Sequence, residues 1–76
     1  MDLKLITFEL ASGETWQAPY NTEAMRDTIM ATFVGENCLT MGVMVDGFAR
    51  LYDLAGSQVG TIYTMDFPLG IAIRVK

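Results

Sequence analysis

The amino-acid sequence predicts an α+β fold, in which one helix packs on an antiparallel, strongly curled sheet of five to six strands in the order ββαββββ. Three observations support this prediction. Asp46-Gly47 separates two rows of β-forming residues, one stretch repeats its apolar residues at helical spacing, and other short apolar runs end at glycine or proline. The length of 76 residues corresponds to a single domain over residues 1–76.

The first two strands are expected at residues 2–10 and 15–18, joined by a turn. Apolar and polar residues alternate along the first strand, but the alternation is interrupted near Leu5. The interruption indicates either a bulge or a strand that is covered on both faces. Pro19 should end the second strand, because proline has no N–H to donate to a sheet.

One helix is expected over residues 22–34. Asn21 is a favoured N-cap, and Gly35 should end the helix in the left-handed conformation. Apolar residues four positions apart form a stripe that the helix should lay on the sheet. The stripe comprises Met25, Ile29 and Phe33, widened by Ala24, Met30 and Val34.

Residues 39–65 are expected to form three antiparallel strands with two tight turns. Asp46-Gly47 suits a two-residue type I′ hairpin, which needs positive φ at both positions and places Val45 opposite Phe48. Gly56-Ser57 suits a type II′ turn. That second turn would set the remaining pairs, which are Leu54 with Val59, Tyr52 with Thr61, Arg50 with Tyr63, and Phe48 with Met65.

This register predicts one aromatic and apolar face with Arg50 as its one charge, and an opposite face that is also largely apolar. A sheet with one wet face should instead alternate between apolar and polar residues. The second face should therefore be covered by the helix, by a curled sheet that closes on itself, or by another copy of the protein. Gly42 and Gly60, inside strands, indicate bulges or a sharp bend, and a last strand is expected at residues 70–75.

The composition excludes several kinds of chemistry. The chain has no histidine and one cysteine, Cys38, so it lacks the parts of a Ser-His-Asp triad or of the usual zinc site. Cys38 is expected to be a small buried apolar residue, and no catalytic residue, metal or cofactor is predicted. Nine acidic and five basic residues make direct nucleic-acid binding unexpected. Without a signal-like or membrane-spanning run, the expected location is the cytoplasm.

Arg50 and Tyr63 are the most informative pair, because an arginine facing a tyrosine can stack on its ring. One interpretation is a sheet-edge pair in which Arg50 extends to water. The other is an anchor for a protein interface, since interfaces favour tyrosine, methionine and arginine. The candidate interface comprises Phe48, Arg50, Tyr52, Tyr63 and Met65.

The function expected from these features is that of a small acidic, non-enzymatic protein-interaction domain that self-associates through its sheet as a homodimer. One alternative is a compact inhibitor or accessory protein, of the kind found in phages and mobile elements, that blocks a larger cytoplasmic enzyme or nucleoprotein complex. A third is a small-molecule binding module, with a pocket between Trp16, the helix and residues 39–65.

Overall fold

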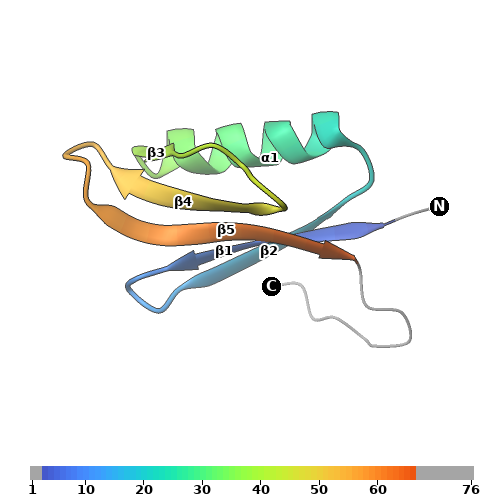
Figure 1. Ribbon diagram of the computed structural model, residues 1–76, viewed down its shortest axis with the longest axis horizontal. Helices are drawn as coiled ribbons and strands as arrows, with labels where there is room; N and C mark the ends of the chain where they lie inside the picture. The colour runs from blue at the N-terminus through green and yellow to red at the C-terminus, as the bar shows by residue number, and fades with distance from the viewer. Residues whose placement is uncertain (1–2, 67–76) are drawn as a thin grey trace.

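The structure is a computed structural model that describes residues 3–66, and it contains one helix and five strands in that range (Figure 1). The strands pair antiparallel in the spatial order β2-β1-β5-β4-β3. In chain order the elements are β1 (Lys4–Leu10), β2 (Thr15–Tyr20), α1 (Glu23–Glu36), β3 (Leu39–Met41), β4 (Phe48–Asp53) and β5 (Gln58–Asp66).

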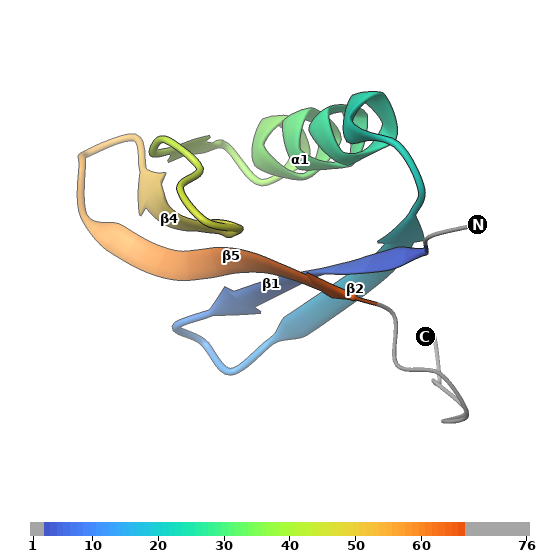
Figure 2. The same ribbon diagram turned by 45° about the vertical axis from the view of Figure 1, so that its right-hand side comes forward.

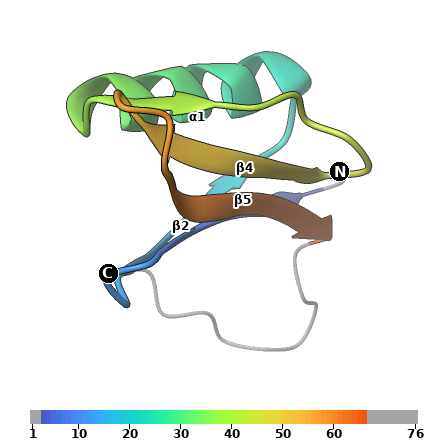
Figure 3. The same ribbon diagram turned by 60° about the vertical axis from the view of Figure 1, so that its left-hand side comes forward.

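The helix lies on one side of the sheet only, as the rotated views show (Figures 2 and 3). The α+β class and the order of the elements are therefore confirmed. The expectation of a strongly curled sheet is wrong, because the five strands form an open sheet with β2 and β3 at its two edges. The predicted last strand at residues 70–75 lies outside the described residues.

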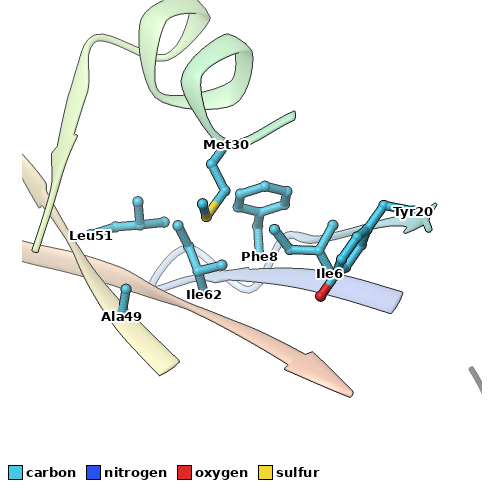
Figure 4. Packing of buried hydrophobic residues seen from close by; sticks show 7 residues of the cluster. All are labelled: Ile6, Phe8, Tyr20, Met30, Ala49, Leu51 and Ile62. Atoms are coloured by element: carbon cyan, nitrogen blue, oxygen red, sulfur yellow. The ribbon is translucent and has the colours of Figure 1, made fainter. Parts of the chain in front are cut away.

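The core lies between α1 and the face of the sheet beneath it (Figure 4). Met30 is the buried residue of the helix, and it points toward the buried side chains of β1, β4 and β5. The Phe33 ring of α1 stacks on Phe8, with ring centroids 4.0 Å apart. The buried cluster consists of Ile6, Phe8, Tyr20, Met30, Ala49, Leu51 and Ile62.

Burial of both faces of β1 explains its interrupted alternation. The strand pairs without a register shift to β2 on one side and to β5 on the other, so it contains no bulge. Leu5 and Thr7, which face away from the helix, are as fully buried as Ile6 and Phe8. Of the two alternatives that the sequence left open, a bulge or a strand covered on both faces, the structure shows the second.

The second strand is longer than the sequence predicts. β2 continues through Pro19 to Tyr20, although Pro19 was expected to end it. β2 is an edge strand, so the Pro19 nitrogen can face away from β1, where its missing N–H removes no hydrogen bond of the sheet.

Both ends of the helix differ from the prediction. Thr22 is the N-cap, and its Oγ1 accepts a hydrogen bond from the Met25 N–H at 3.2 Å, a role expected of Asn21. The helix also continues through Gly35 to Glu36. Asn37 caps the C-terminus by donating its Nδ2 to the Phe33 carbonyl at 2.9 Å, and Cys38 takes the left-handed conformation that was predicted for Gly35.

The Asp46-Gly47 turn is confirmed. Both residues have positive φ, 52° and 76°, and Val45 and Phe48 exchange backbone hydrogen bonds across the turn. The Gly47 carbonyl also accepts from the Thr64 N–H at 2.8 Å, which ties the turn to β5.

The turn between β4 and β5 is not the predicted two-residue type. Asp53 Oδ1 accepts from the N–H groups of Ala55 and Ser57, and the Asp53 N–H donates to the Ser57 carbonyl. The carboxylate thus organises a longer loop. The loop moves the pairing beside it by three residues from the predicted register, and a one-residue bulge at Leu51 and Tyr52 leaves a net shift of two between the rest of β4 and β5.

The pairing of β3 differs by one residue. Met41 lies opposite Leu51 instead of Tyr52, because residues 42–44 contain one more residue than the facing part of β4. A shift of one residue moves side chains to the other face of a sheet. Leu39 and Met41 therefore pack against the core beneath the helix, and the aromatic face that carries Arg50 is less apolar than the sequence indicated.

Candidate functional site: the helix-free sheet face

The sheet face turned away from α1 carries all five residues of the predicted interface. We call it the open face, and its central residues are Glu9 of β1, Thr61, Tyr63 and Met65 of β5, and Phe48, Arg50 and Tyr52 of β4. Side chains of paired residues share a face, so the pairs of these strands establish the assignment. Phe48 is 40% exposed and Met65 is 43% exposed, although both are large and apolar.

The predicted pair of Arg50 with Tyr63 does not form. The two-residue shift places Thr61 opposite Arg50 and Tyr63 opposite Phe48. The Arg50 guanidinium instead lies over the ring of Phe48, with Cζ 5.6 Å from the ring centroid. Such a contact orients an exposed guanidinium by its attraction to the aromatic face.

Glu9 is the member of the open face that the sequence did not indicate. Its Oε2 accepts a hydrogen bond from the Tyr63 hydroxyl at 3.1 Å. Burial raises the pKa of Tyr63 above its ordinary value, and the hydrogen bond to Glu9 and the negative charge of Glu9 raise it further. The two residues are 54 positions apart, so only the pairing of β1 with β5 brings them together.

Three residues form a row across the open face. Glu9 pairs with Thr61, and Thr61 pairs with Arg50, so the acid and the base lie on either side of the central strand β5. Neighbouring strands are about 4.8 Å apart, which separates the Glu9 and Arg50 backbones by about 10 Å. Among the ion pairs between described residues, none involves Glu9 or Arg50.

A second feature is a cleft of about 300 Å³ between α1 and β2. Trp16 lies on its wall with 51% of its surface exposed, and Phe33, Ile29 and Ala18 supply further apolar lining. The sequence predicted a pocket between Trp16, the helix and residues 39–65. The observed lining comes from α1, β2 and Phe8 of β1, so residues 39–65 are not part of it as far as the described chain extends.

Three further observations concern metal binding, Cys38 and membrane spans within residues 3–66. No group of three or more cysteine, aspartate or glutamate side chains is placed to hold a metal ion there. Cys38, expected to be buried, is exposed, because the turn that follows α1 places it at the surface. In the same range, no helix has the length and apolar character needed to cross a membrane.

Comparisons of the chain with protein-family models, with curated proteins and with solved structures find no match. The basis for a function is therefore the geometry of the open face and of the α1–β2 cleft.

Proposed function

We propose that the protein is a small, acidic, non-enzymatic protein-interaction domain that binds a second copy of itself through the open face. The observation that supports this proposal most is the row Glu9–Thr61–Arg50, in which opposite charges flank the central strand. A surface that binds its own copy must be self-complementary, because a two-fold axis brings each residue against its counterpart.

The row meets this condition for two open faces packed against each other. Consider a two-fold axis that runs between the two sheets, parallel to β5. It places the β4 side of one copy against the β1 side of the other. Arg50 of one copy then lies across from Glu9 of the other, and the reverse contact forms at the same time. The strands of the two sheets would run in nearly the same direction, which is one of the usual arrangements of packed sheets.

The apolar residues of the open face fit the same arrangement. Tyr63 and Met65 belong to β5, so each lies close to the axis and near its own counterpart. Phe48 lies one strand away from the axis, beside Tyr63, and is 40% exposed. Burial of such exposed aromatic and methionine side chains provides the main favourable free energy of protein association.

Charge reversal tests the proposal. R50E and E9R each place like charges in both symmetric contacts, and each should weaken the dimer by about 2 kcal/mol, or about thirtyfold in the dissociation constant. The double variant R50E/E9R restores opposite charges and should dimerise within about threefold of the unaltered protein. Sedimentation analysis over a dilution series measures all four dissociation constants.

The matched control is E14R, which makes the same charge change as E9R in the exposed turn between β1 and β2. E14R should leave the dimer unaffected. A double variant no tighter than the single variants, or an E14R effect as large as that of E9R, would rule out the Arg50–Glu9 contact. An unaltered protein that stays monomeric at high concentration would overturn the proposal itself.

A further inference from the structure

β2 is an edge strand of the sheet that residues 3–66 form. It pairs only with β1 among the described strands, and its residues 15–17 and Pro19 are exposed. The opposite edge of the sheet, β3, has three residues, whereas β2 has six. An exposed edge strand presents unpaired N–H and C=O groups that can pair with another strand.

The hairpin fixes which backbone groups point outward. The Leu10 N–H donates to the Glu14 carbonyl at 2.9 Å, so these two residues form a hydrogen-bonded pair next to the turn. In an antiparallel pair such positions alternate, so Trp16, Ala18 and Tyr20 bond to β1. Thr15 and Gln17 then direct their N–H and C=O groups outward. Pro19 occupies an outward position as well, where its missing N–H leaves the β1 ladder intact.

The α1–β2 cleft adjoins this edge. Trp16 and Ala18 face the helix and line the cleft, together with Ile29 and Phe33. Gln17 also borders the cleft, although its side chain donates Nε2 to Thr7 Oγ1 at 3.2 Å on the open face. A strand added beside β2 would thus bond to outward backbone groups and place alternate side chains toward the helix.

One end of the cleft favours positive charge. Glu36 lines the cleft in the last turn of α1, and that turn contains no basic residue. The C-terminal end of a helix is itself negative because its last carbonyl groups are aligned. Glu14 directly precedes β2, two residues from Trp16 and so toward the same end.

From these observations we propose that β2 and the α1–β2 cleft bind an extended peptide by strand addition. The peptide pairs with the backbone of Thr15 and Gln17. It inserts an aliphatic or aromatic side chain against Trp16 and Phe33, and it carries a lysine or arginine two positions away, toward Glu36. This second site lies at the sheet edge and on the helix side, apart from the proposed dimer contact on the open face.

The test begins with a random-peptide display library selected against the immobilised full chain. The expected enriched sequences alternate β-branched or aromatic residues and carry a basic residue. Synthetic peptides of the enriched sequence are then titrated while Trp16 fluorescence is followed, since Trp16 is the chain's single tryptophan. Failure to enrich any sequence, or enrichment without basic residues, would overturn the proposal.

Two substitutions at one position separate backbone pairing from side-chain contacts. Q17P removes the outward N–H at a position of the same kind as Pro19, and it should weaken peptide binding by about tenfold. Q17A removes the side chain but keeps that N–H, so its affinity should stay within about twofold of the unaltered protein. Equal affinities of Q17P and Q17A would contradict strand addition.

Amide hydrogen exchange on the unaltered protein gives a result that does not depend on how well Q17P folds. Peptide binding should slow exchange of the Thr15 and Gln17 N–H groups, which point outward, and unchanged exchange at both would refute the proposal. E36Q should weaken binding severalfold at low salt and have less effect at high salt, because salt screens exposed charges. The R50E variant should bind the peptide like the unaltered protein, so the two proposals can fail independently.

Discussion

Gly60 offers the sharpest test of how the two halves of the sheet are joined. A Cβ added at Gly60 would lie 2.5 Å from the Glu9 carbonyl oxygen and 3.3 Å from the Leu10 Cα. These are backbone atoms of β1, which is held between β2 and β5, so they can move only if β1 and β5 separate. Gly60→Ala should therefore destabilise the protein by disturbing the pairing of the N-terminal hairpin with residues 39–65.

The expected magnitude follows from typical costs of overpacking. Forcing an extra methyl group into a packed site costs about 1–3 kcal/mol, and backbone contact at this distance belongs at the upper end. Replacing glycine also restricts the unfolded chain, which offsets about 0.5 kcal/mol. A net loss of about 2 kcal/mol corresponds to a fall in Tm of about 8–16 °C for a domain of this size.

Gly35→Ala is the matched control. Gly35 lies inside α1, without positive φ, and an added Cβ would meet no atom within 4 Å. Alanine is a better helix former than glycine, so Tm should rise by about 2–8 °C. Both variants are measured by thermal denaturation at one protein concentration, because dimerisation makes Tm depend on concentration. A Gly60→Ala protein as stable as the unaltered one would refute the β1–β5 register.

Two further predictions concern the helix cap and the open face. Thr22→Ala should cost about 1 kcal/mol in denaturant unfolding, whereas Asn21→Ala should be nearly neutral; the reverse order would place the N-cap at Asn21. Glu9→Gln should lower the pKa of Tyr63. This pKa is measured from tyrosinate absorbance after the signal of a Tyr63→Phe control is subtracted, and an unchanged pKa would exclude the contact between Tyr63 and Glu9. Because folding raises this pKa, the stability that Tyr63 contributes should be fully present below about pH 10 and be lost as the pH rises through the raised value.

The sequence predicted the elements that depend on residues close together in the chain. Asp46-Gly47 specified its hairpin because few residue pairs accept positive φ at two successive positions. The helix was found from its apolar spacing, but its ends were set by two side chains: Thr22 accepts a hydrogen bond from the Met25 N–H, and Asn37 donates one to the Phe33 carbonyl. The loop after β4 was missed for the same kind of reason, since the Asp53 carboxylate organises it.

The candidate interface kept its face because of the size of the register error. The loop after β4 and the bulge together shifted the pairing of β4 with β5 by two residues, and a shift of two leaves every side chain on its original face. Arg50 and Tyr63 thus remained on the predicted face although they are not partners. The single extra residue in 42–44 had the opposite effect and moved Met41 to the core.

Glu9 could not be found from the sequence. Its contact with Tyr63 depends on the pairing of β1 with β5, which no turn or local spacing encodes. The α1–β2 cleft depends likewise on how the helix lies across the sheet. Both features arise from tertiary packing of segments that are individually ordinary.

The most direct test of the central claim, self-association through the open face, is a nuclear Overhauser experiment on a mixture of isotope-labelled and unlabelled protein. Filtering for contacts between copies reports the residues at the interface. We predict contacts from the Met65 methyl group and the Tyr63 ring to the same residues of the second copy, because β5 lies along the proposed axis. Contacts confined to other surfaces would contradict the account. So would a spectrum without contacts between copies, if the unaltered protein and the Arg50→Glu variant give the same result at the same concentration.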